Sequence, residues 1–228
     1  MPERSDKAID PTPIRTRIEA GLQQIFGSNS AEAAHAETLT RLVLLLAQWA
    51  PRMNLTGHRD PLEMTSRLLL DAAALVGALP ELSGAVDLAD LGSGAGFPGL
   101  PIAILRPHLQ VYLVDARQRR HHFQREARRV LGLGNVEPLL GRSEKIQSRA
   151  CDVVVAQAMA QPEDAIELMK PWARAGGLLV LPASDRAERP IPRSSGEPLE
   201  RPPERRCYRV PYAGIERQLW ILTTPGQG

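Results

Sequence analysis

Beyond Gly84 the sequence alternates between short apolar runs and longer stretches of helical periodicity, and this alternation limits the chain to few folds. The apolar runs, each short enough for a single strand, are Val86–Leu91, Val111–Val114, Asn135–Leu140, Asp152–Ala156 and Leu178–Leu181. The helical stretches between them are Pro98–Leu105, Arg117–Leu131 and Pro162–Trp172. Strands and helices at this spacing form βαβ units, whose parallel sheet is covered on both faces. The sequence therefore predicts an α/β fold with a mainly parallel sheet flanked by helices.

The first third of the chain is expected to be helical, because apolar residues recur there at helical spacing. The three predicted helices are 14–26, 30–49 and 61–79. Ser30 suits the N-cap of the second helix, which Pro51 is expected to stop. Asp60 and Pro61 form a good N-cap and first-turn pair for the third. The expected divisions of the chain are a flexible tail over 1–12, an N-terminal helical segment over 13–80 and an α/β domain over 84–228.

The end of the chain breaks the alternation. Residues 182–205 are rich in proline and mixed charge and poor in apolar groups, so we expect a loop there. The runs Tyr208–Tyr212 and Gln218–Thr223 that follow predict a closing antiparallel hairpin.

Composition sets broad limits on location and partners. The chain has 228 residues, of which 43% are hydrophobic, which is enough for one domain with a sizeable core. Its N-terminus is polar and no apolar stretch approaches about 18 residues, so we expect neither a secretory signal nor a membrane span. Cys151 and Cys207 do not have metal-ligand spacing, and a net charge of +2 permits nucleic-acid binding without requiring it. We expect a cytoplasmic protein with no metal.

The strongest chemical signal is the glycine-rich turn Asp90–Gly99 (DLGSGAGFPG), which lies between the first strand and the first helix of the alternating region. The letters GAGFPG fit the dinucleotide fingerprint, whereas DLGSGAG fits the loop of S-adenosylmethionine enzymes. The carboxylate of Asp90 favours the second, because it would repel a pyrophosphate and attract an ammonium or sulfonium. Pro98 also removes an N–H from a phosphate cradle. We therefore expect S-adenosylmethionine, with NAD as the alternative cofactor.

Polar residues after the next two strands fit a nucleoside ligand. Asp115 ends the second strand 19 residues after Gly96, where βαβ nucleotide folds place the carboxylate that accepts from ribose hydroxyls. The alternative is a capping role for the helix that begins at Arg117. Ser143 and Glu144 follow the third strand, where they could contact an adenine edge, although Glu144 also suits a solvated surface acid.

In these residues the chain resembles the bacterial 16S rRNA guanine-N7 methyltransferases, once named glucose-inhibited division protein B. The resemblance spans about residues 35–182, and DLGSGAGFPGLP is its most specific string, because a generic methyltransferase loop does not continue FPGLP. The matching stretches are 53–57 (MNLTG), Arg67 with Leu70-Asp71, Asp90–Pro101, Val114-Asp115, 134–137 (GNVE), 141–144 (GRSE) and 152–154 (DVV).

The resemblance implies a Rossmann-like class I methyltransferase fold, with S-adenosyl-L-methionine as cofactor and the 16S ribosomal RNA of the small ribosomal subunit as substrate. The residues expected at the cofactor are Asp90, Gly92, Gly94, Gly96, Phe97, Asp115, Ser143, Glu144 and Gln157. Guanine N7 carries an exposed lone pair, so methyl transfer to it needs alignment but no general base. We expect Arg52, Arg67 and Asp71 on the substrate side, and a monomer.

Several positions depart from the family pattern. Leu68 and Ala72 stand where the family has histidine and serine, and Pro182 begins the pair that replaces a lysine and a glycine. Gln157 stands where the family has an arginine that touches the cofactor. These departures support one alternative function, a paralogue that binds the cofactor, is catalytically weakened and acts as an RNA- or ribosome-binding protein.

Other methylation chemistries fit less well. The residues after the fourth strand, 156–159 (AQAM), lack the Asn/Asp-Pro-Pro-aromatic run of amino-group methylases. Cys151 opens a strand and suits a packed core thiol better than a nucleophile for pyrimidine C5. The many arginines of 117–131 fit a phosphate-binding patch and an ordinary solvated helix face about equally.

Overall fold

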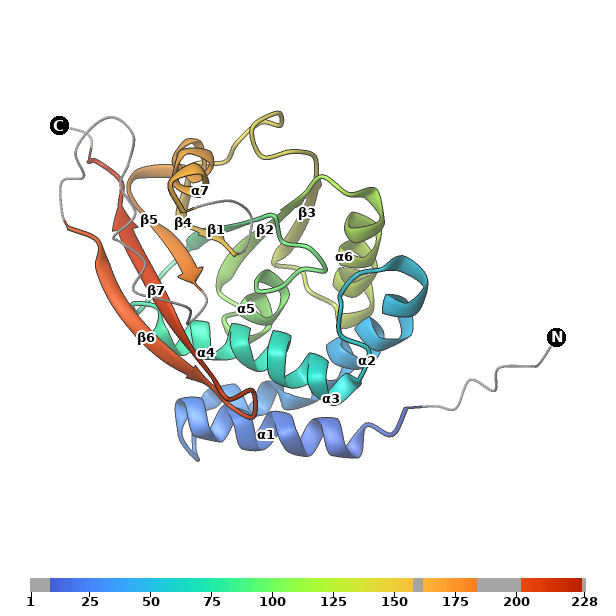
Figure 1. Ribbon diagram of the computed structural model, residues 1–228. Helices are drawn as coiled ribbons and strands as arrows, with labels where there is room; N and C mark the ends of the chain where they lie inside the picture. The colour runs from blue at the N-terminus through green and yellow to red at the C-terminus, as the bar shows by residue number, and fades with distance from the viewer. Residues whose placement is uncertain (1–8, 158–161, 184–201, 227–228) are drawn as a thin grey trace.

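A seven-stranded sheet forms the centre of the computed structural model, which describes residues 9–157, 162–183 and 202–226 (Figure 1). Its order is β3-β2-β1-β4-β5-β7-β6. The strands are β1 Val86–Leu91, β2 Leu109–Asp115, β3 Val136–Leu140, β4 Cys151–Ala156, β5 Ala173–Ala183, β6 Glu204–Val210 and β7 Ile215–Thr223. Strands β1 to β5 pair in parallel, whereas β7 is antiparallel to both β5 and β6. The predicted Rossmann-like fold, with its mainly parallel sheet and closing hairpin, is confirmed.

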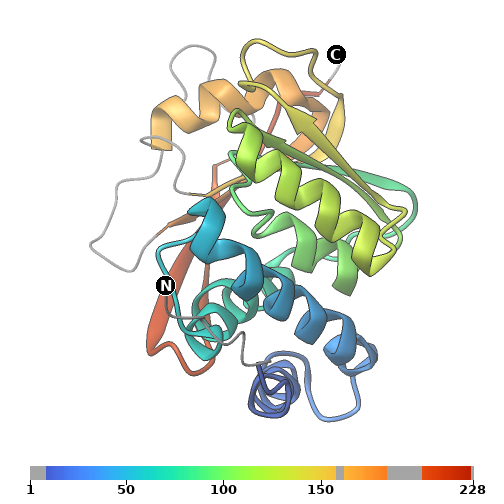
Figure 2. The same cartoon turned by 90° about the vertical axis from the view of Figure 1, so that its right-hand side faces the viewer.

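Helices cover both faces of this sheet. The longer helices are α1 Thr12–Phe26, α2 Ala36–Met53, α4 Leu70–Ala78, α5 Gly99–Leu105, α6 Gln118–Leu131 and α7 Pro162–Met169, with α3 Pro61–Met64 as a single short turn. Successive strand residues point to opposite faces, so Leu88 lies in the core under α5 and α6 while Ala89 lies in a second core under α7. Figure 2 shows α2 beside α6 on the first face and α7 on the other.

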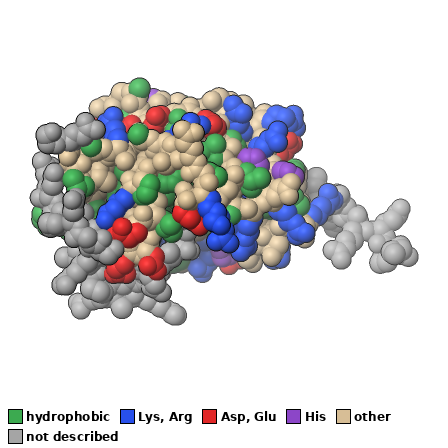
Figure 3. Space-filling model, turned by 90° about the horizontal axis from the view of Figure 1, so that it is seen from above, with side chains coloured by type: hydrophobic (Ala, Val, Ile, Leu, Met, Phe, Trp, Pro, Cys, Tyr) green, Lys and Arg blue, Asp and Glu red, His purple; other side chains and the backbone are tan. Residues whose placement is uncertain are grey.

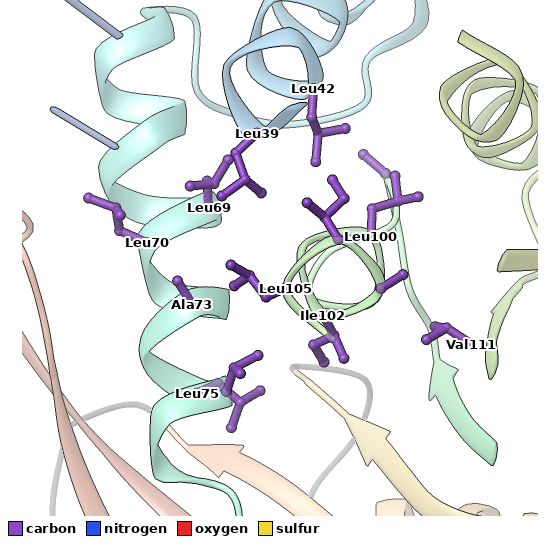
Figure 4. Packing of buried hydrophobic residues seen from close by; sticks show 14 of the residues in the cluster. Leu39, Leu42, Leu69, Leu70, Ala73, Leu75, Leu100, Ile102, Leu105 and Val111 are labelled. Atoms are coloured by element: carbon purple, nitrogen blue, oxygen red, sulfur yellow. The ribbon is translucent and has the colours of Figure 1, made fainter. Parts of the chain in front are cut away.

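The N-terminal helices share a hydrophobic core with the sheet domain. Leu100 and Leu105 of α5 lie between Leu39 and Leu42 of α2 and the buried face of α4 (Figure 4). All of these side chains are at most 3% exposed. The helical segment therefore braces α5, the helix that follows the glycine-rich turn.

Two of the three predicted helix signals differ from the structure. Asp60 caps its helix as expected, accepting from the backbone N–H groups of Leu62 and Glu63. Pro51 does not stop α2, which continues to Met53 and ends where Asn54 adopts a left-handed φ of 50°. A proline so close to the C-terminal end of a helix removes only one backbone hydrogen bond, because it has no N–H. The last turn of α2 still forms, with the Asn54 N–H donating to Ala50 O at 3.1 Å. The Ser30 side chain makes no cap and precedes a 3-10 turn over Ala31–His35.

The third predicted helix is continuous but not uniform. Between α3 and α4 the segment Thr65–Leu69 forms a π-helical turn. Such a turn inserts one residue per turn and changes the direction in which the following side chains point. The side chain of Asp71, near the start of α4, is directed into the protein as described below.

The C-terminal boundaries also needed correction. Strand β5 begins at Ala173 rather than at Leu178, because an irregularity in the β4 pairing carries the strand through Gly176 and Gly177. Residues 182–183 and 204–205 belong to β5 and β6 rather than to the predicted loop, and 184–201 lie outside the described residues. Among the residues that the structure describes, no helix has the length and apolarity that crossing a bilayer requires.

Candidate functional site

The glycine-rich turn lies at the point where the strand order changes direction. Strand β1 has β2 on one side and β4 on the other, with Leu91 opposite both Val114 and Ala156. The chain moves outward from β1 to β3 and then returns to β4, which makes the carboxyl edge between β1 and β4 the switch point of the sheet. Ligands of open α/β sheets bind in this crevice.

The turn needs glycine for conformation and for space. Gly92, Gly94 and Gly96 have φ values of 70°, 59° and 85°, in the left-handed region that favours glycine. A Cβ on Gly96 would lie 2.5 Å from Leu100 Cδ1, and one on Gly99 would lie 2.8 Å from Asp90 Oδ2. The turn is therefore closely fitted to its own helix and strand.

Asp90 is buried under the turn with one oxygen free. The residue is 1% exposed, and its Oδ2 accepts from the Gly99 N–H at 2.8 Å. Its Oδ1 has no hydrogen-bond partner among the described residues. Burial raises the pKa of this carboxyl to about 7, the Gly99 hydrogen bond opposes the rise and the charge of Asp115 adds to it. The site thus holds a buried acceptor that a cationic ligand group would satisfy.

The raised pKa predicts how stability depends on pH. Without ligand, Asp90 takes up its proton near pH 7 in the folded state but only near 3.8 when unfolded. The carboxyl's contribution to folding is therefore fully present below about pH 4 and is lost as the pH rises to about 7. We expect the free energy of unfolding of the wild type, relative to the Asp90→Asn variant, to fall over this range and level off above it. Urea denaturation at several pH values measures this difference, and a constant difference from pH 5 to 8 would refute it.

Asp115 connects the turn to the helix that follows β2. Its Oδ1 accepts from the Arg117 N–H at 2.8 Å. Its Oδ2 accepts from the Gly94 N–H and from Arg120 Nη1, both at 3.0 Å. Arg117 is the N-cap residue of α6, and its own side chain makes no cap hydrogen bond. Asp115 accepts from the N–H of this N-cap residue and also from the turn and from Arg120, so the capping alternative describes only part of what Asp115 does. A carboxylate has about four acceptor positions, so one remains for a ligand hydroxyl.

Ser143 and Glu144 lie beyond β3 at the same edge of the sheet, where the Gly141 N–H donates to Asp115 O at 3.1 Å. Glu144 is exposed, and its carboxylate pairs loosely with Arg142 at 3.8 Å. The carbonyl of Ser143 accepts from the Trp172 indole N–H at 3.1 Å, which fixes the backbone of this turn. Their proposed contact with an adenine edge stays a prediction.

Gln157 and Asp71 lie together, although they were expected at the cofactor and on the substrate side respectively. Gln157 Nε2 donates to Asp71 Oδ2 at 3.3 Å. Asp71 is 4% exposed and also accepts from Arg217 Nη2 at 2.7 Å and from the Tyr208 hydroxyl at 3.2 Å. Burial and the charge of Asp71 raise the pKa of Tyr208, which stays a neutral donor. This buried group joins α4 to the end of β4 and to the C-terminal hairpin.

Arg52 and Arg67 occupy more open positions. Both are exposed, Arg52 at the end of α2 and Arg67 in the π-helical turn. Arg67 pairs with Glu63 at 3.5 Å, an exposed contact that leaves it available to other anions. The structure places neither of them in the group around Asp71, and their substrate role stays a prediction.

Gln124 lies directly under the turn and was not among the predicted site residues. It is fully buried on α6, and its amide donates to Ser93 Oγ at 2.9 Å and to Gly94 O at 2.8 Å. Its Oε1 has no partner among the described residues. Its only signal in the sequence was a polar residue beside the buried face of the helix, next to Phe123.

Comparisons with known proteins find one family repeatedly. The family model described as GidB, rRNA small subunit methyltransferase G, matches residues 35–192. A protein of that name from Chromohalobacter salexigens is 37% identical over 212 residues, covering 90% of this chain and 95% of its own length. Another from Xanthomonas axonopodis pv. citri is 40% identical over 177 residues, covering 77% and 79%.

Among solved structures, a SAM-dependent methyltransferase from Aquifex aeolicus is similar with a TM-score of 0.49 and 20% identity, covering 72% of this chain and 93% of its own. The family match covers more than half of the chain, and the sequence relatives align over most of their length. This chain therefore belongs to the rRNA small subunit methyltransferase G family.

Proposed function

We propose that this chain is an S-adenosylmethionine-dependent enzyme that methylates N7 of a guanine in the 16S rRNA of the small ribosomal subunit. The observation that carries the proposal is the glycine-rich turn at the sheet's switch point, with the free oxygen of Asp90 buried beneath it. Relatives that align over most of the chain are named for small-subunit rRNA methylation.

The polar groups of the site suit S-adenosylmethionine better than NAD. A dinucleotide pyrophosphate needs free backbone N–H groups in the turn. Here the N–H groups of Gly92, Ser93, Gly94, Gly96, Phe97 and Gly99 all donate within the protein. What the site offers instead is acceptors, namely the free oxygens of Asp90 and Gln124 and the remaining acceptor position of Asp115. Asp90 would hold the ammonium group and Asp115 a ribose hydroxyl.

The chain's contribution to the reaction is alignment. When bound, S-adenosylmethionine supplies a methyl group activated on a sulfonium. Guanine N7 attacks with its own lone pair, so no residue has to remove a proton beforehand. Asp90, Asp115 and the turn would fix one reactant by charge-assisted hydrogen bonds. Two reactants already positioned by binding lose less entropy in reaching the transition state than two that meet freely.

Methyl transfer to purified small subunits tests the proposal. The wild type, supplied with methyl-labelled S-adenosylmethionine and subunits from a strain lacking this enzyme, is expected to label 16S rRNA and yield 7-methylguanosine on nucleoside mass spectrometry. Labelling at another base position would refute the N7 assignment. Tight binding of S-adenosylhomocysteine without any transfer would instead favour the non-catalytic paralogue that the replacement at Gln157 suggests.

The substrate also suggests where the protein acts. Because ribosomal subunits are assembled in the bacterial cytoplasm, we propose the same compartment for this chain. A single chain holds every residue of the candidate site, and a monomer stays a prediction.

A further inference from the structure

Helices α2 and α6 lie on the side of the protein away from the C-terminal hairpin (Figures 1 and 2). Residues of both helices line an open groove. The two helices run antiparallel, because Trp49 meets Phe123 at one end and Arg41 donates to Val130 O at 2.7 Å at the other. The groove has a volume of about 700 Å³ and is lined by Trp49, His122, Arg125, Glu126, Arg128, Arg129 and 132–134. We call it the α2–α6 groove.

The walls of the α2–α6 groove carry uncompensated positive charge. Arg125 and Arg128 are exposed and form no ion pair within the described part of the chain. Arg129 is held by Glu126, with nitrogen–oxygen distances of 2.8 and 2.9 Å, so the acid in the groove is already neutralised. Figure 3 shows blue arginine and lysine and purple histidine side chains gathered toward one end of the molecule. Such a wall suits phosphate groups.

One partly exposed aromatic ring lies in the same groove. Trp49 packs edge-on against the buried Phe123 with ring centroids 5.9 Å apart, which holds the indole without covering it. The other tryptophans are buried, Trp172 at 0% and Trp220 at 4% exposure. A held indole between arginines offers a stacking surface for a base whose phosphates those arginines neutralise, a combination typical of single-stranded nucleic-acid binding.

Helix α6 connects the α2–α6 groove with the proposed cofactor site. Gln124, the neighbour of Arg125 in sequence, donates from the buried face of α6 to Gly94 O in the glycine-rich turn. Arg120, one turn earlier, pairs with Asp115. A strand of RNA lying along α6 would therefore lead toward the crevice between β1 and β4.

We propose that the α2–α6 groove binds a single-stranded segment of the substrate RNA next to the methylated base, with a base stacked on Trp49 and phosphates on Arg125 and Arg128. This rests on the proposed function for the identity of the RNA, but the binding itself can be measured without methyl transfer. An ordinary solvated helix face would bind no RNA in this way.

Tryptophan fluorescence with RNA oligonucleotides is the direct test. Single-stranded RNA of about 12 nucleotides is expected to quench the emission of the full-length protein, whereas a duplex of equal length quenches little. Trp49→Phe should lose the quenching yet keep affinity within about threefold, while Trp49→Leu should bind about tenfold more weakly. The Arg125→Gln/Arg128→Gln variant should reduce the slope of log affinity against log salt by about 1.4, because each lost phosphate contact contributes about 0.7.

Controls separate this proposal from the proposed function and from unfolding. Arg209→Gln changes an exposed arginine on β6, a strand on the opposite side of the molecule from α6 in Figure 1, and should leave affinity and salt slope unchanged. On small subunits, the arginine double variant should raise KM about tenfold at nearly unchanged kcat and unchanged S-adenosylhomocysteine affinity. The Trp49→Leu and arginine double variants could keep the oligonucleotide affinity, salt slope and KM of a wild type that transfers methyl groups. That result would refute RNA binding in the α2–α6 groove and leave the proposed function intact. If the wild type transfers no methyl group but binds RNA, and the variants lose that binding, RNA binding in the α2–α6 groove is supported and the proposed function is refuted.

Discussion

Replacing Asp115 with alanine is expected to weaken S-adenosylhomocysteine binding at least about 100-fold, which corresponds to about 2.7 kcal/mol. The carboxylate is 5% exposed and accepts from Gly94, Arg117 and Arg120, so it holds the turn in shape. It also supplies the acceptor that we assign to a ribose hydroxyl. Charge-assisted hydrogen bonds of this kind contribute about 1.5–3 kcal/mol each. Isothermal calorimetry on the purified variant measures the loss.

Arg120→Ala is the matched control for Asp115→Ala. It removes the ion pair of 3.0 Å but leaves the carboxylate with its bonds to Gly94 and Arg117. If Asp115 contacts the ligand, the Arg120 variant should lose less than about tenfold in affinity while the Asp115 variant loses much more. Thermal melts without ligand show whether each variant is folded. An Asp115→Ala protein that is folded and binds within about threefold of the wild type would contradict the assigned role.

Replacing Asp71 with alanine is expected to destabilise the protein by about 3–5 kcal/mol, because it removes the buried carboxylate that accepts from Gln157, Tyr208 and Arg217. The side chains of this pair are only 5% and 20% exposed, and Arg217 Nη2 and Nε lie 2.7 and 3.0 Å from Asp71 Oδ2. For a chain of this length the melting temperature should fall by about 6–20 °C. The loss would release Gln157 and the hairpin from α4, so S-adenosylhomocysteine affinity should fall as well.

Two further variants define what the Asp71 result means. Glu19→Ala removes the exposed pair with Arg15, in which both side chains are about half exposed, and should leave the melting temperature close to that of the wild type. Asp71→Leu combined with Arg217→Leu removes both charges and should be more stable than Asp71→Ala alone. Equal melting temperatures for Asp71→Ala and Glu19→Ala would show that the buried group does not tie the sheet edge together.

Sequence reasoning predicted the parallel part of the sheet because each strand is a short apolar run bounded by turn signals. It located the turn and both of its acids, Asp90 and Asp115, because glycines and carboxylates at the ends of strands are local features of the chain. The extension of α2 beyond Pro51 was missed because one lost backbone bond near a helix end is outweighed by tertiary packing, in this case the burial of Ala50.

The contacts of Asp71 could not be predicted from the sequence. Its partners Gln157, Tyr208 and Arg217 are far away along the chain and meet it only because the hairpin returns to α4. Gln124 was missed for the same reason, since its bonds to Ser93 and Gly94 depend on how α6 packs against the turn. Long-range polar contacts of this kind follow from the fold and leave no periodic pattern.

Calorimetric titration of S-adenosylhomocysteine into the full-length wild type, with NAD titrated in parallel, tests the central claim that the turn between β1 and α5 holds an activated-methyl nucleoside. The account predicts saturable binding of one S-adenosylhomocysteine per chain, lost in the Asp115→Ala variant, and no binding heat with NAD. Saturable NAD binding in a protein that takes up no S-adenosylhomocysteine would contradict it.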